Sequence, residues 1–104
     1  MFKNVVVGVD EHEGGRDAVA LARLLVSEGG ELTLGYVYHG DAHVWRGSSA
    51  PYEAVERERA RELLEKARDE AGIEAQLRWR SAASAGRGLH ELAEEIGADV
   101  LVVG

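Results

Sequence analysis

Two apolar segments, one near each end of the chain, constrain its fold most strongly. Residues 4–10 read NVVVGVD and residues 99–103 read DVLVV, so apolar and mostly β-branched side chains occupy successive positions. A strand has this composition when helices cover both faces of its sheet, as they do for the central strands of a parallel sheet. The two segments therefore predict a parallel sheet, whose strands must be joined by long crossover connections.

The residues between these two segments alternate between helix and strand patterns. The apolar spacing predicts helices over residues 16–28, 52–71 and 89–96, and strands over residues 31–39 and 73–81. A glycine follows each predicted helix, and residues 40–51 have the composition of a loop. The alternation predicts an α/β fold, a doubly wound parallel sheet with helices on both faces and right-handed crossovers.

The strand over residues 73–81 differs from the others because apolar and polar side chains alternate strictly along it. One wet face is typical of a strand at the edge of a sheet. If residues 4–10 and 99–103 lie side by side in the middle, the strand order is 3-2-1-4 in chain numbering. Ligands of open α/β sheets bind at the switch point of such an order, here beyond the carboxyl ends of the first and fourth strands.

Composition excludes several classes of protein. The 104 residues allow one domain, and no apolar run approaches the roughly 18 residues that span a bilayer. A formal net charge of −7 argues against a nucleic-acid partner, because binding to phosphates depends on lysine and arginine. With no cysteine and no signal-peptide core at the N-terminus, we expect a cytoplasmic protein.

Three stretches, NVVVGVDEHEGGRDAVALA, ELTLGYVY and GLHELAEEIGADVLVVG, resemble the universal stress protein family. The resemblance implies five parallel strands ordered 3-2-1-4-5. For one branch of the family it also implies ATP binding through a motif G-x2-G-x9-G-[S/T]. Gly104 matches the first glycine of that motif, and the remainder, a fourth helix and a fifth strand have no counterpart in the sequence. We therefore expect residues 1–104 to form a single, C-terminally incomplete domain of this family.

The resemblance also implies a nucleotide-binding set at the switch point. Asp10 matches the acidic residue that accepts from the adenine amino group, and Val9 matches a position lining the adenine pocket. Val37 matches a position in the second strand whose backbone meets the adenine. Val103 and Gly104 match neighbours of the nucleotide at the end of the fourth strand. Because most of the phosphate motif is absent, we expect ATP in the full-length protein but weak or absent ATP binding by the 104 residues.

The residues after Asp10 depart from the family. The family usually has a glycine and a serine there, whereas this chain has Glu11, His12 and Glu13. These carboxylates would face bound phosphates unfavourably unless a metal or a protonated His12 offset them. An alternative is a weak metal-dependent ATPase or hydrolase that uses Asp10, His12 and Glu13. We favour a non-catalytic module, because no nucleophile is paired with a base in the sequence and no lysine or arginine precedes Arg16 in this loop.

Other candidate residues carry a weaker signal. His39 and His43 are four residues apart, but they lie on a strand end and a loop, where this spacing imposes no metal geometry. We interpret them as solvated side chains and predict no metal site. Trp45 lies in the loop, where packing against the following helix and covering a ligand are equally compatible with the sequence.

The last predicted strand has a consequence for association. The family usually dimerises through its fifth strand, which has no counterpart here, so the edge from Asp99 to Val103 is expected to be unpaired. An apolar strand edge tends to pair with another strand. We therefore expect a homo-oligomer, with an adenine nucleotide as the small-molecule partner and no membrane partner.

Overall fold

The computed structural model describes residues 2–10, 14–39 and 49–103. Four parallel strands form one sheet in the order β3-β2-β1-β4. The elements in chain order are β1 (Phe2–Gly8), α1 (Gly14–Leu25), β2 (Val26–His39), α2 (Ser49–Ala71), β3 (Gln76–Ala82), α3 (Ala85–Ile96) and β4 (Val100–Val102). The α/β class, the strand order 3-2-1-4 and the edge position of β3 are as predicted from the sequence.

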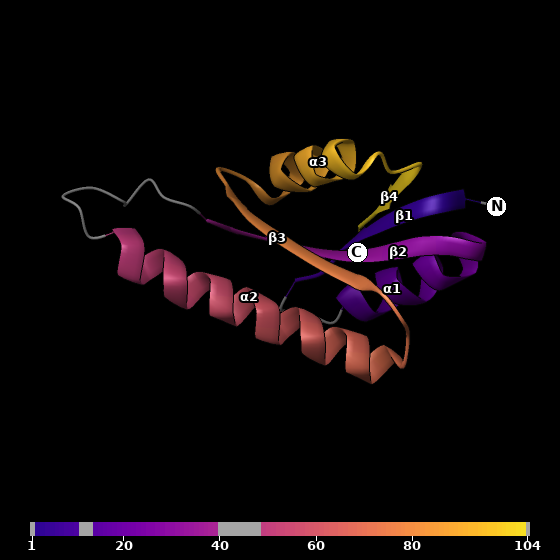
Figure 1. The fold of residues 1–104 in the computed structure, drawn as a ribbon, viewed down its shortest axis with the longest axis horizontal. Helices are drawn as coiled ribbons and strands as arrows, with labels where there is room; N and C mark the ends of the chain where they lie inside the picture. Colours follow the sequence, from indigo (N-terminus) through magenta and orange to yellow (C-terminus); the bar gives the residue numbers. More distant parts are fainter. Residues whose placement is uncertain (1, 11–13, 40–48, 104) are drawn as a thin grey trace.

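Helices cover both faces of the sheet, with α3 on one side and α1 and α2 on the other (Figure 1). On the α1 and α2 side, Val5 and Val7 of β1, together with Val9 just after it, join one core cluster with Leu34 of β2. The helices contribute small residues and Leu64 to the same cluster. Since Val5, Val6 and Val7 are all fully buried, β1 is covered on both faces, as its unbroken apolar run predicts.

Glycines let α3 approach the other face of the sheet closely. A Cβ added to Gly8 of β1 would lie 2.5 Å from Leu89 Cδ1 of α3. A Cβ on Gly35 of β2 would lie 3.3 Å from Leu92 Cδ1. These leucines take the space that side chains on the strands would otherwise fill, so α3 packs directly over β1 and β2.

Several element boundaries differ from the sequence prediction. The first helix ends at Leu25, not at residue 28, because Val26 already pairs with Phe2 at the start of β2. The register then shifts, so that Asn4 pairs with Glu31, and Gly29 adopts a φ of 81° inside this irregular stretch. The predicted glycine cap of α1 is therefore a bend within β2.

The third helix begins at Ala85, four residues before the apolar stripe suggested, because Ser84 caps it. The Ser84 hydroxyl oxygen accepts from the Arg87 amide at 3.2 Å. β3 begins at Gln76, later than predicted, although Ile73 and Ala75 still pack against the core. Helix α2 begins at Ser49, inside the predicted loop 40–51. No helix in residues 14–39 or 49–103 is long and apolar enough to cross a membrane.

Candidate nucleotide site at the carboxyl edge of the sheet

The strand register brings the predicted site residues to one edge of the sheet. Gly8 pairs with Gly35 and Val7 pairs with Val102. Residues 9 and 10, which follow β1, therefore lie level with residues 36 and 37 of β2, and residue 103 lies level with Gly8. The helix after β1 lies on one face and the helix before β4 lies on the other (Figure 1). This edge is the topological switch point, where α/β proteins bind ligands.

Val9 contributes mainly backbone to this edge. Its side chain is only 8% exposed and belongs to the core cluster on the α1 and α2 side. Its amide donates to the Gly35 carbonyl at 2.8 Å, which extends the pairing of β1 and β2 beyond the end of β1. Val9 therefore fixes the direction in which the chain leaves the sheet and positions the residue that follows it.

Asp10 is the first exposed residue after β1. The buried run from Val5 to Val9 ends there, so Asp10 lies at the carboxyl edge, directly after the Val9 amide that bonds to the sheet. A carboxylate is an acceptor only, and it can accept from an amino or hydroxyl group of a ligand. The role in adenine recognition that the resemblance implies for Asp10 stays a prediction.

Val37 lies half-buried beneath the first turn of α3. A Cβ on Gly88 would lie 2.6 Å from Val37 Cγ2 and 3.0 Å from Ala82 Cβ, both closer than carbon atoms pack. Gly88 is thus a close-contact position, and its missing side chain is what lets α3 rest on Val37. Sequence reasoning missed this contact, although the glycine-rich run SAGRG before Leu89 could have indicated it.

The two remaining strand-end residues are described only in part. Val103 follows β4 and is 61% exposed, whereas Val102 before it is 7% exposed. Gly104, His12, Glu13, His43 and Trp45 lie outside the described residues, so their predicted roles stay predictions. His39 ends β2, where its backbone pairs with Ala82 of β3.

Charged side chains of β3 and α3 form ion pairs on the α3 side of the sheet. β2 separates these pairs from β1. The Arg80 guanidinium pairs with Glu95 and, at 3.6 Å, with Glu91, while Arg78 approaches Glu95 at 3.8 Å. The hydrogen bond to Glu95 raises the pKa of Arg80 above its ordinary value, and the charge of Glu91 raises it as well. The spacing of two on a strand and four on a helix could have predicted this pairing from the sequence.

The charged residues that the structure describes form no metal centre. Within residues 2–10, 14–39 and 49–103, no three histidine or acidic side chains lie together in a group that could hold a metal ion. The proposed set Asp10, His12 and Glu13 is outside this test, since two of its members are not described.

Comparisons with known proteins agree with the fold and the strand order described above. The family model described as the universal stress protein family matches residues 1–104. The crystal structure of protein Rv1636 from Mycobacterium tuberculosis H37Rv is 26% identical, with a TM-score of 0.61 over 99% of this chain and 71% of that chain. A crystal structure of a universal stress protein in complex with cAMP is also 26% identical, with a TM-score of 0.63 over 99% of this chain and 76% of that one. A search of the curated proteins finds no match. From the strand order, the switch-point residues and the match over its whole length, the chain belongs to the universal stress protein family.

Proposed function

We propose that this universal stress protein is a single-domain, non-catalytic, cytoplasmic stress-response module that binds an adenine nucleotide at the carboxyl edge of its sheet. The observation that carries the proposal is the convergence of Val9, Asp10, Val37 and Val103 at the switch point between β1 and β4. A similar protein of known structure was determined in complex with cAMP, which supports a nucleotide as the ligand class.

Within the proposed site, each group has a distinct role. The Asp10 carboxylate accepts from the adenine amino group, and the backbone of Val37 meets the adenine, while its half-buried side chain supports the first turn of α3. Val103 is exposed at the end of β4 and bounds the site on the other side of β1. Gly104 follows Val103 in the sequence and is assigned to the phosphate end, as the family motif implies.

The charge of the neighbouring sequence bears on which adenine nucleotide binds. Glu11 and Glu13 follow Asp10 directly, so the loop carries three carboxylates in four residues. Repulsion from these carboxylates grows with the number of charges on the ligand, and ATP carries several where cAMP carries one. We therefore propose that this chain prefers cAMP to ATP, and that ATP binding is weak.

Isothermal titration calorimetry of the full chain with cAMP and with ATP tests the proposal. Asp10→Ala removes the acceptor and is expected to weaken cAMP binding about tenfold, the effect of losing one hydrogen bond to a charged group. Asp17→Asn is the matched control, because Asp17 is also exposed but lies in the first turn of α1. Absence of binding at millimolar nucleotide, or equal affinity of the Asp10→Ala variant, would refute the nucleotide assignment.

A second candidate function, protein interaction, is favoured by the β4 edge. β4 is the outer strand of the sheet, and β1 is its neighbour on the inner side. Helix α1 packs on both strands and carries two exposed leucines, Leu21 at 49% and Leu24 at 73%. On α1, Arg16 pairs with Glu70 of α2, and Leu21, five residues later, lies on roughly the opposite side of the helix, on the flank turned toward β4. We propose that a second copy of the chain covers this flank and the β4 edge.

A further inference from the structure

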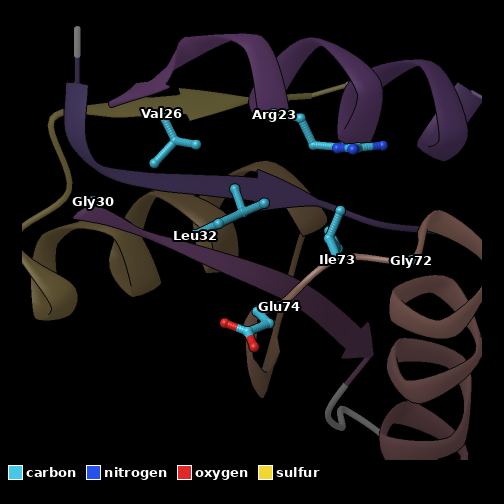
Figure 2. A pocket seen from close by; sticks show the side chains of 7 residues that line it. All are labelled: Arg23, Val26, Gly30, Leu32, Gly72, Ile73 and Glu74. Carbon is cyan, nitrogen blue, oxygen red and sulfur yellow. The ribbon is translucent and has the colours of Figure 1, made fainter. Parts of the chain in front are cut away.

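A hollow lies at the amino edge of the sheet, at the opposite end of the strands from the candidate nucleotide site. Its volume is about 350 Å³, near the lower limit of small-molecule sites. The last turn of α1, the first part of β2 and the turn between α2 and β3 enclose it (Figure 2). The lining residues are Arg23, Val26, Gly30, Leu32, Gly72, Ile73 and Glu74. We call this hollow the amino-edge cleft.

The floor of the amino-edge cleft is apolar. Leu32 is 7% exposed and belongs to the core cluster, and Val26 and Ile73 pack against that cluster while remaining partly exposed. Their side chains approach the same space beneath α1, from β2 and from the turn before β3 (Figure 2). The cleft is therefore a place where the core reaches the surface and an apolar group would be removed from water.

Glycines keep the cleft open. A Cβ on Gly30 would lie 2.9 Å from the Lys3 carbonyl oxygen and 3.0 Å from Val26 Cγ2, so no side chain fits there. Gly72 has a φ of 64°, which favours glycine, and its amide is already bonded to Arg68 and Asp69 of α2. The rim at these two positions is bare backbone, which leaves the apolar floor accessible.

Arg23 supplies a cation at the rim. Its Nη1 donates to the Ala71 carbonyl at 3.4 Å, a long bond that ties the guanidinium to the end of α2. Within the described part of the chain no carboxylate lies within 4.0 Å of it, and Glu74 on the same rim makes no ion pair with it. By contrast Arg16, two turns earlier on α1, pairs with Glu70. Four of the five guanidinium N–H donors of Arg23 remain for a ligand.

We propose that the amino-edge cleft binds a small monocarboxylate with an apolar body. The carboxylate pairs with the Arg23 guanidinium, and the apolar body lies on Val26, Leu32 and Ile73. Glu74 on the rim disfavours ligands with a second negative charge. This site is separate from the proposed nucleotide site and does not depend on it.

Titration of the ¹⁵N-labelled full chain with hexanoate, followed by amide chemical shifts, tests the proposal. We expect saturable shifts at Gly30, Ile73 and Glu74 without shifts at Val9 and Asp10. Hexylamine has the same chain length and the opposite charge, so it is expected not to bind. Arg23→Gln is expected to weaken hexanoate binding about tenfold. Arg87→Gln, which changes an exposed arginine at the other end of the sheet, is expected to leave the binding unchanged.

Three results would overturn the proposal: no saturable shift at the cleft up to millimolar hexanoate, equal binding of hexylamine, or full affinity in the Arg23→Gln variant. Should Arg23→Gln perturb the fold through its contact with Ala71, Glu74→Gln gives an independent readout. It removes the repelling carboxylate, so hexanoate affinity is expected to rise, and an unchanged or lower affinity would count against the site. Because nucleotide binding is followed at Asp10, failure at either end of the sheet leaves the result at the other end interpretable.

Discussion

The Asp99 carboxylate accepts a hydrogen bond from the backbone of Asn4, although the two residues are far apart in the sequence. Its Oδ2 atom accepts from the Asn4 amide at 3.1 Å and from the Lys3 amide at 2.9 Å. In return the Asp99 amide donates to the Asn4 carbonyl at 2.8 Å, and Asn4 Nδ2 donates to the Ile96 carbonyl at 3.1 Å. These bonds hold the start of β1 against the turn between α3 and β4. Asp99, which lies in the stretch GLHELAEEIGADVLVVG, therefore has a structural role.

Replacement of Asp99 is expected to loosen this attachment. Asp99→Ala removes the acceptor of two backbone amides, and because the site is exposed we expect a loss of about 1 kcal/mol in the free energy of unfolding. Asp99→Asn keeps one amide oxygen as an acceptor and is expected to lose less. Urea unfolding of the three proteins followed by circular dichroism measures both differences, and equal stability of all three would show that the bonds contribute nothing.

Gly88 offers a test of the contact between α3 and β2. Gly88→Ala places a methyl group within 2.6 Å of Val37 Cγ2, so the helix or the strand must shift, at a cost of about 1–3 kcal/mol. Nucleotide binding is expected to weaken with it, because Val37 lies in the proposed site.

The matched control for Gly88 is Gly86, two residues earlier in the same helix. A Cβ at Gly86 would meet no atom within 4 Å, so Gly86→Ala is expected to stabilise the chain by about 0.5–1 kcal/mol through helix propensity. Thermal unfolding of both variants gives the comparison. If the two changes shift the midpoint in the same direction, the close contact at Gly88 is not the cause.

Arg80 joins β3 to α3, and its removal is expected to cost more than removal of a surface arginine whose ion pair lies within one helix. Arg80→Met keeps the aliphatic stem but leaves Glu91 and Glu95 without this cation, for an expected loss of about 1 kcal/mol in unfolding free energy. Arg59→Met is the control, since Arg59 is 63% exposed and pairs with Glu56 at 3.6 Å within one helix. Denaturant unfolding at low and high salt should show a larger salt-sensitive loss for Arg80 than for Arg59.

The pair of Glu58 and Arg61 on α2 gives stability a defined pH dependence. The hydrogen bond from Arg61 lowers the pKa of Glu58 below its ordinary value of 4.5. A group whose pKa is lower in the folded state stabilises that state above its unfolded pKa and loses the effect as the pH falls through the folded value. Glu58→Gln is therefore expected to be less stable than wild type at pH 7 and no less stable near pH 2. A difference that persists at the lower pH would contradict this assignment.

The β4 side of α1 is expected to control association. Leu21→Asp introduces a charge where the side chain is 49% exposed, so the fold should tolerate it, whereas a second copy could no longer cover this flank. Val55→Asp, at 60% exposure on α2, is the control away from the β4 edge. Sedimentation velocity at several protein concentrations should show association for wild type and Val55→Asp and its loss for Leu21→Asp. Monomeric wild type at high concentration would refute the proposed contact.

The strand order could be predicted because a central strand is buried on both faces and an edge strand on one. The sequence of apolar and polar side chains along each strand reflects this difference. In β1 the run Val5 to Val7 is buried on both faces, whereas in β3 the exposed Gln76 and Arg78 alternate with half-buried apolar residues. The ends of elements could not be predicted in the same way. The end of α1 depends on the pairing of Val26 with Phe2, a long-range contact that no local pattern encodes.

The candidate site was only partly predictable for a similar reason. Asp10 follows from its place after a buried strand, and the register then places it near Val37. The support of Val37 by Gly88 depends on how closely α3 approaches the sheet, and the capping of that helix by Ser84 sets where the approach begins. Both depend on packing between elements that are far apart in the sequence.

The central position of β1 has a consequence for synthesis of the protein. Its first neighbour, β2, follows soon after it, but the pairing with β4 and the bonds to Asp99 join residues 95 positions apart. At translation rates of about 5–20 residues per second, roughly 5–20 s separate the two strands on the ribosome. During that interval β1, whose residues Val5 to Val7 are fully buried in the folded domain, has an open edge, because its pairing with β4 can form only after β4 has emerged. The pairing of β1 is therefore completed only after Asp99 and β4 have been made, and a nascent chain stalled before Asp99 would present β1 to chaperones or to other nascent chains.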